Sequence, residues 1–157
     1  MSKKAVHFRH NDKDISAFVD DGENLLDFLR RNIGDLTVKY GCGQGTCGAC
    51  TVLINGDPRL SCLTLAEDIN SQKIETIAGI SDNGKLHPLQ KAFMENFAAQ
   101  CGYCTTGMIL SAKALLNKNP NPSKEDVIDA ISGNICRCTG YEPIINAILD
   151  VSNKKTV

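Results

Sequence analysis

The 157-residue chain lacks the features that mark several specialised classes of protein. It contains no tryptophan and few aromatic residues, and 17 Lys and Arg against 18 Asp and Glu leave a net charge of −1. That balance gives no reason to expect a nucleic-acid partner. No apolar run approaches the ~20 residues of a membrane-spanning helix, and residues 1–9 lack the apolar core of a secretory signal. We therefore expect a cytoplasmic globular protein with no membrane partner.

Cysteine, by contrast, is abundant in this chain. Its eight cysteines fall into two groups of four, separated by the gap between Cys62 and Cys101. Because the cytosol keeps thiols reduced, a disulfide framework is disfavoured, and metal ligation or redox chemistry is the better interpretation. The count suggests two sites with four ligands each.

The first group lies in the glycine-rich stretch 41–50. Cys42, Cys47 and Cys50 have the C-x4-C-x2-C spacing of plant-type [2Fe–2S] ligands, which require a fourth cysteine further along the chain. Cys62 is the nearest candidate, although its separation of 11 residues from Cys50 is short for a free-standing plant ferredoxin. Glycines allow such a loop to adopt positive φ and to bring amides close to the sulfurs. Structural zinc is an alternative, but zinc sites prefer paired C-x2-C motifs, which the spacing of Cys42 and Cys47 breaks.

The second group comprises Cys101 and Cys104, in a C-G-Y-C motif, and the C-x-C pair of Cys136 and Cys138. Taken alone, the first motif resembles a thioredoxin-like dithiol. That interpretation requires a βαβ context, whereas a helical pattern precedes the motif, and it leaves the other two cysteines without a role. A C-x-C pair is poor for zinc but can serve a cluster when both thiolates point inward from a tight turn.

Hydrophobic periodicity divides the chain into an α+β half and a helical half. In the first half it predicts a hairpin of 6–8 with 15–19, a helix at 25–33, and strands at 51–54, 60–63 and 74–77. In the second half it predicts helices that begin near Pro88, Met108, Ser123 and Ile144. The first of these helices has an apolar stripe made of Leu89, Phe93 and Phe97. We expect two domains, at 1–80 and 81–157, joined by a polar linker at 81–85.

Three motifs that occur in order along the chain resemble the small iron–sulfur subunit of the molybdenum hydroxylases. This is the family of xanthine dehydrogenase, aldehyde oxidoreductase and carbon monoxide dehydrogenase. The motifs are the cysteine spacing from Cys42 to Cys62, the run Q-C-G-Y-C-T-T-G-M at 100–108, and the run C-R-C-T-G-Y at 136–141. The resemblance covers essentially the whole chain. It departs from the family at Thr106, where proline is usual, and this change removes no ligand.

The resemblance implies a fold and two cofactor sites. The fold would be α+β, with an N-terminal β-grasp ferredoxin-like domain and a C-terminal four-helix bundle, each binding one [2Fe–2S] cluster. The ligands of the cluster distal to molybdenum would be Cys42, Cys47, Cys50 and Cys62. Those of the proximal cluster would be Cys101, Cys104, Cys136 and Cys138. Gln100 would hydrogen-bond the pterin of the molybdenum cofactor, and Cys138 would also lie in contact with it.

The neighbours of the second cysteine group support smaller expectations. Arg137 would offset the negative charge of a cluster held by four thiolates, or would equally well face solvent or another subunit. Tyr103 and Tyr141 flank the second site, where they would shield a cluster from water and so influence its potential, or would simply be core aromatics with the hydroxyl at the edge. No role is expected for His7, His10 or His87, which show no ligand spacing.

The resemblance also implies what the chain does. It would be the non-catalytic iron–sulfur subunit of an oxidoreductase, relaying single electrons from a molybdopterin site through two clusters toward FAD or another acceptor. The substrate would be an N-heterocycle, an aldehyde or a related compound. The expected partners are a large molybdopterin-binding subunit and a medium FAD-binding subunit, in a dimer of hetero-oligomers. The alternatives are a free-standing ferredoxin-like carrier and a zinc-binding interaction module.

Overall fold

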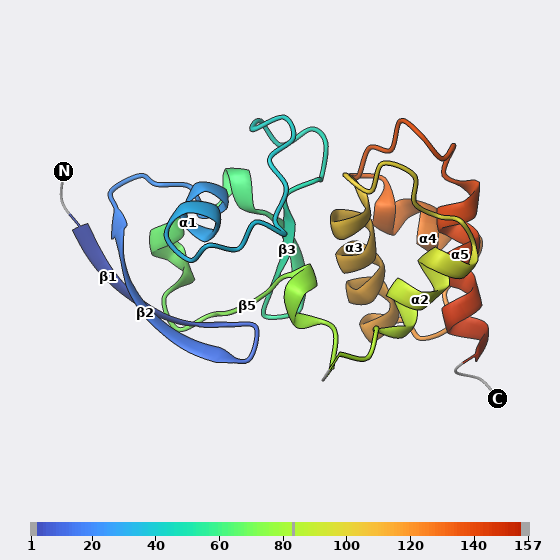
Figure 1. Ribbon diagram of the computed structural model, residues 1–157, viewed down its shortest axis with the longest axis horizontal. Helices are drawn as coiled ribbons and strands as arrows, with labels where there is room; N and C mark the ends of the chain where they lie inside the picture. Colours follow the sequence, from blue (N-terminus) through green and yellow to red (C-terminus); the bar gives the residue numbers. More distant parts are fainter. Residues whose placement is uncertain (1–2, 83, 155–157) are drawn as a thin grey trace.

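The computed structural model describes residues 3–82 and 84–154. In these residues a five-stranded mixed sheet carries one α-helix, and four α-helices follow it along the chain (Figure 1). The predicted order of an α+β half before a helical half is confirmed. No helix in the described part of the chain is long and apolar enough to cross a membrane.

The sheet joins two hairpins through a short fifth strand. Its strands, in the spatial order β2-β1-β5-β3-β4, are β1 (Lys3–His10), β2 (Lys13–Asp20), β3 (Thr51–Ile54), β4 (Asp57–Leu60) and β5 (Lys73–Glu75). β5 pairs in parallel with β1 and antiparallel with β3. Asn55 and Gly56, both at positive φ, form the turn between β3 and β4, as an Asn-Gly pair predicts.

Helix α1 (Leu25–Arg31) begins at a side-chain cap and buries its apolar face against the sheet. Asn24 caps it by accepting a hydrogen bond from the Asp27 amide at 2.8 Å. Phe28 is fully buried and its ring lies 5.9 Å from that of Phe8 on β1, centroid to centroid. Burial of a side chain of this size stabilises the fold by about 1.5–3 kcal/mol.

The strand predicted at 60–63 is wrong beyond its first residue. β4 ends at Leu60, and Ser61–Leu63 form a turn of 3-10 helix that carries Cys62. Ser61 is fully buried, and its hydroxyl donates to the Cys50 carbonyl at 2.8 Å. The chain therefore turns inward toward Cys50 instead of continuing along the sheet.

The helical half has a buried core of its own, which one strand of the sheet joins. Its helices are α2 (Pro88–Glu95), α3 (Thr105–Lys118), α4 (Lys124–Ile131) and α5 (Glu142–Lys154). α2 packs on α5, α4 packs on both α3 and α5, and α3 faces β3 across the middle of the molecule (Figure 1). Leu53 of β3 belongs to the same buried cluster as Phe93 and Met108. The two halves are therefore in direct apolar contact.

The apolar stripe predicted on the first of these helices is wrong at its last member. α2 ends at Glu95, and Phe97 lies beyond it with a φ of 52° and 85% of its surface exposed. The Ala98 amide donates to the Phe93 carbonyl at 2.8 Å, closing the helix with a left-handed residue at the position where glycine is common. Phe97 therefore contributes nothing to the core.

We expect Phe97→Gly to raise the free energy of unfolding by about 0.5 kcal/mol, because relief of the left-handed strain exceeds the backbone entropy that glycine loses on folding. Urea denaturation measures the change. Phe97→Ala is the matched control, since it removes the ring but keeps the Cβ at positive φ. An equal gain in the alanine variant would contradict the strain argument.

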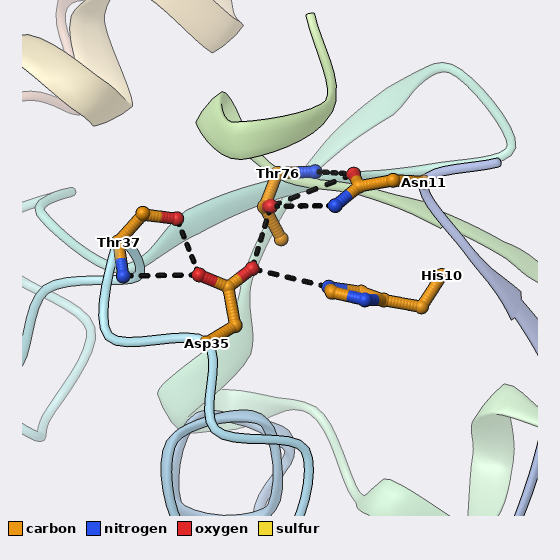
Figure 2. A network of polar contacts seen from close by, with 5 residues as sticks. All are labelled: His10, Asn11, Asp35, Thr37 and Thr76. Atoms are coloured by element: carbon orange, nitrogen blue, oxygen red, sulfur yellow. Dashed lines mark hydrogen bonds and ion pairs between the residues drawn. The ribbon is translucent and has the colours of Figure 1, made fainter. Parts of the chain in front are cut away.

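A buried polar network ties the segment before the first cysteine group to the sheet (Figure 2). The Asp35 carboxylate accepts from the Thr37 amide at 3.0 Å and from the Thr76 hydroxyl at 2.6 Å, and it pairs with His10 Nε2 at 3.1 Å. Asn11 extends the network by accepting from the Thr76 amide at 2.9 Å. Burial opposes ionisation of Asp35, but the hydrogen bonds, first that from His10, hold the pKa of its carboxyl well below its usual range.

Asp35→Asn is expected to lower the free energy of unfolding by about 2 kcal/mol at pH 7. The folded-state pKa is depressed, so the carboxylate stabilises the fold above its ordinary pKa of 3.8, and this contribution is lost as the pH falls through the lower folded value. The difference in the free energy of unfolding between the wild type and Asp35→Asn should therefore stay constant between pH 8 and 5 and shrink only below that range. Denaturation at a series of pH values measures it. Asp12→Asn, at a carboxylate that is 84% exposed, is the control and should change little.

Candidate metal centres

The first cysteine group is divided between the loop 41–50 and the turn after β4. Cys47 contributes to the lowered pKa of Cys42, and Cys50 to the raised pKa of Cys62, so each of these two pairs of thiols lies close together. The Thr46 amide donates to Cys42 Sγ at 3.2 Å, which is the amide-to-sulfur contact that the glycine-rich loop predicts. The group thus consists of two cysteine pairs supported by backbone donors.

The second group is assembled from two loops that are far apart in the sequence. Cys101 and Cys104 lie between α2 and α3, whereas Cys136 and Cys138 lie between α4 and α5. Cys138 Sγ is 3.7 Å from Cys101 Sγ, and Cys104 lies close to Cys136, which contributes to its raised pKa. As the helical pattern predicts, the two loops meet at one end of the helical half.

A cavity of about 220 Å³ lies at this second group. Its cysteine lining consists of Cys47, Cys101, Cys104, Cys136 and Cys138. One wall of the cavity therefore comes from the first group. No feature of the sequence predicted that the two groups adjoin.

The thiols of the two groups differ in how easily they ionise. The Thr46 hydroxyl, with neighbouring backbone amides, lowers the pKa of Cys42 to about 5. Burial raises the pKa of Cys62 to about 11 and that of Cys104 to about 12. Because a thiol must lose its proton to ligate a metal, loading these sites would release protons from Cys62 and Cys104.

The pairing of the cysteines fits [2Fe–2S] clusters better than single ions. A [2Fe–2S] cluster spreads four thiolates over two irons, which calls for two pairs, whereas structural zinc requires four ligands at one point. Glycine also leaves room beside the thiols, because a Cβ on Gly41 would lie 2.5 Å from Cys47 Sγ.

Hydrogen bonds to main-chain carbonyls join the two cysteine groups. The Ile135 amide donates to the Cys47 carbonyl at 2.9 Å, and the Tyr103 hydroxyl donates to the Tyr40 carbonyl. In Figure 1 the loop 41–50 and the orange loop after α4 reach the same edge of the molecule. Ile135 immediately precedes Cys136, so one hydrogen bond separates the backbones of the two groups.

The predicted neighbours of the second group lie mainly at the surface. Gln100 and Cys138 are both exposed, and Gln100 Nε2 donates to the Cys138 carbonyl at 3.1 Å. Arg137 is also exposed. Tyr141 is half-buried, and its hydroxyl accepts from the Cys136 amide at 3.0 Å, so this tyrosine supports the loop.

Sequence reasoning missed Asn134, which is buried where the two cysteine groups meet. Its amide donates to the Gly48 carbonyl, 86 residues away in the chain. Its position two residues before Cys136 was the only available signal, and no local pattern connects it to the first group.

Two family models match the chain. One, described as a 2Fe-2S iron-sulfur cluster binding domain, matches residues 8–74. The other, described as a [2Fe-2S] binding domain, matches residues 76–149. Between them they span all eight cysteines.

Relatives and solved structures agree with these matches. The nicotinate dehydrogenase small FeS subunit of Eubacterium barkeri is 47% identical over 148 residues, which are 94% of each chain. A chain of quinoline 2-oxidoreductase from Pseudomonas putida 86 superposes with a TM-score of 0.94 at 44% identity, covering 98% of this chain and 95% of that one. The aldehyde oxidoreductase of Desulfovibrio desulfuricans gives a TM-score of 0.93 at 40% identity, and there the match covers 98% of this chain but 17% of the longer one.

Proposed function

This chain belongs to the small iron–sulfur subunits of the molybdenum hydroxylase family and serves in electron transfer, and we propose how its residues carry out that role. The first cysteine group binds the distal cluster through Cys42, Cys47, Cys50 and Cys62. The second binds the proximal cluster through Cys101, Cys104, Cys136 and Cys138. The observation that carries this division is the meeting of the eight thiols in four pairs, two within each group.

Each pair is suited to one iron. In the distal cluster, one iron would be held by Cys42 and Cys47 and the other by Cys50 and Cys62. In the proximal cluster, one iron would be held by Cys101 and Cys138 and the other by Cys104 and Cys136. When bound, each cluster supplies a one-electron couple, so that the two electrons of a substrate oxidation leave singly. The chain itself holds the two sites in contact, through the hydrogen bond from Ile135 to Cys47.

Gln100 and Cys138 are proposed to face the molybdopterin. Both are exposed, and the bond between the Gln100 amide and the Cys138 carbonyl holds them on one surface. An exposed amide next to a cluster ligand can hydrogen-bond a polar cofactor presented by another subunit. This surface would therefore receive electrons.

The partners and substrate follow from the relatives. Electrons would come from a large molybdopterin-binding subunit and leave toward a medium FAD-binding subunit or another acceptor, in a cytoplasmic dimer of hetero-oligomers. Relatives named for nicotinate and quinoline favour an N-heterocycle as the substrate class. The domains are proposed to be a β-grasp unit at 1–80 and a four-helix bundle at 81–157.

Iron and acid-labile sulfide analysis tests the assignment. We expect about four iron and four sulfide per copy of this chain, from two [2Fe–2S] sites. EPR of the reduced complex should show two distinguishable centres. Zinc without sulfide, or a single centre with about two iron per chain, would refute the two-cluster proposal. A stable monomer that purifies with no molybdenum-containing partner would instead indicate a free carrier.

A further inference from the structure

Asn134 connects three segments of the chain through one buried side chain. It is 3% exposed, and its Nδ2 donates to the Gly48 carbonyl at 3.0 Å and lies 3.4 Å from Thr51 Oγ1. Its Oδ1 accepts from the Ser111 hydroxyl on α3 at 2.9 Å. The amide thus contacts the first cysteine loop, the start of β3 and the middle of α3, from a position two residues before Cys136.

The three segments approach so closely that glycine is required on both sides of this amide. A Cβ on Gly48, which has a φ of 71°, would lie 2.5 Å from Asn134 Nδ2 and 2.8 Å from Asn134 Cα. A Cβ on Gly107 would lie 2.7 Å from the same Nδ2. The cysteine loops therefore meet directly, with no space for an intervening side chain.

Two adjacent residues of the second cysteine loop donate hydrogen bonds to two adjacent carbonyls of the first. Asn134 holds the Gly48 carbonyl through its side chain, and Ile135 holds the Cys47 carbonyl through its backbone amide at 2.9 Å. Cys47 belongs to the first group, and Cys136 follows Ile135 in the second. Two neighbouring hydrogen bonds fix the orientation of the two cysteine loops as well as their separation. A single bond would allow one loop to rotate relative to the other about the axis of that bond.

We propose that Asn134 is a positioning residue that sets the geometry between the two clusters and, with it, their magnetic and electronic coupling. This inference rests on the cluster assignment proposed above. An amide is suited to the position because Nδ2 faces oxygen acceptors while Oδ1 faces a hydroxyl donor. Aspartate at this site would place a carboxylate oxygen against the Gly48 carbonyl, and alanine would leave that carbonyl without its donor.

A role in stability alone is separated from positioning by a matched control. Lys113 on α3 pairs with Glu75 on β5 at 2.7 Å, and both side chains are largely buried, at 16% and 17% exposed. This ion pair also bridges the two halves, but its residues do not line the cysteine cavity. Lys113→Met therefore removes an interdomain contact without touching either cysteine loop.

The test is low-temperature EPR of the dithionite-reduced, intact complex carrying Asn134→Asp, Asn134→Ala, Ser111→Ala or Lys113→Met. In the wild type we expect two centres with a spin–spin splitting. The Asn134 variants should lose that splitting while retaining both signals and full iron, and Ser111→Ala should reduce it. Lys113→Met should keep the splitting even if its melting temperature falls as much as that of the Asn134 variants.

The outcomes separate the inference from the proposed function. Wild-type splitting in an iron-replete Asn134 variant would overturn the positioning role. Equal loss of splitting in Lys113→Met would also overturn it, because general loosening would then be the cause. If the Asn134 variants do not load iron, Ser111→Ala tests the inference in their place. An unchanged splitting in Ser111→Ala would then count against the positioning role. A wild-type complex without two centres would instead refute the cluster assignment.

Discussion

Cys104→Ser is expected to disturb one of the two EPR signals of the reduced complex and to leave the other intact. Cys104 lines the cavity of the second group and lies beside Cys136, so its loss removes one of the two thiolates proposed for a single iron. A serine hydroxyl is a harder and more weakly ionised donor than a thiol. Iron content should fall toward about two per chain if the proximal cluster is lost altogether.

The reciprocal variant supplies the control. Cys62 resembles Cys104 in being partly buried with a raised thiol pKa, but it belongs to the first group. Cys62→Ser should disturb the signal that Cys104→Ser spares. If either variant abolished both signals in a folded protein, the division of the eight cysteines into two quartets would be wrong.

Gly107→Ala should lower the free energy of unfolding by about 3 kcal/mol, although alanine favours a helix over glycine by about 1 kcal/mol. Gly107 lies in α3, where helix propensity alone predicts a gain. The added Cβ would, however, run into the Gly48 carbonyl oxygen and would lie 2.7 Å from Asn134 Nδ2. Main-chain atoms of another segment cannot give way as a flexible side chain can, so the junction must open.

Gly133→Ala is the matched control at the same junction. No atom lies within 4 Å of the Cβ that it would add, and Gly133 does not adopt a left-handed φ. Its stability by thermal or urea denaturation should remain within about 0.5 kcal/mol of the wild type. Similar losses in the two alanine variants would show that contact across the junction is not what makes Gly107 necessary.

Local patterns predicted most of the elements and failed where a long-range contact overrode them. The helix predicted to begin near Ser123 does so, because Ser123 caps α4 in a box with Asp126 and all the partners of that motif lie within four residues. The apolar pattern predicts a strand at Cys62, yet the buried hydrogen bond from Ser61 to Cys50 turns the chain there. Apolar spacing predicts Phe97 on the buried stripe because it does not reveal that the helix ends at Glu95.

The sequence by itself determined the family, the two groups of four cysteines and the order of an α+β half before a helical half. Cysteine spacing and hydrophobic period are local properties, so they can be recognised in the sequence without knowledge of the fold. Only the tertiary structure decided which thiols pair, and that Cys47 and Cys136 belong to loops in direct contact. The physical reason is the packing of α3 against β3, which brings Gly48 to Asn134 across 86 residues through contacts that no local pattern encodes.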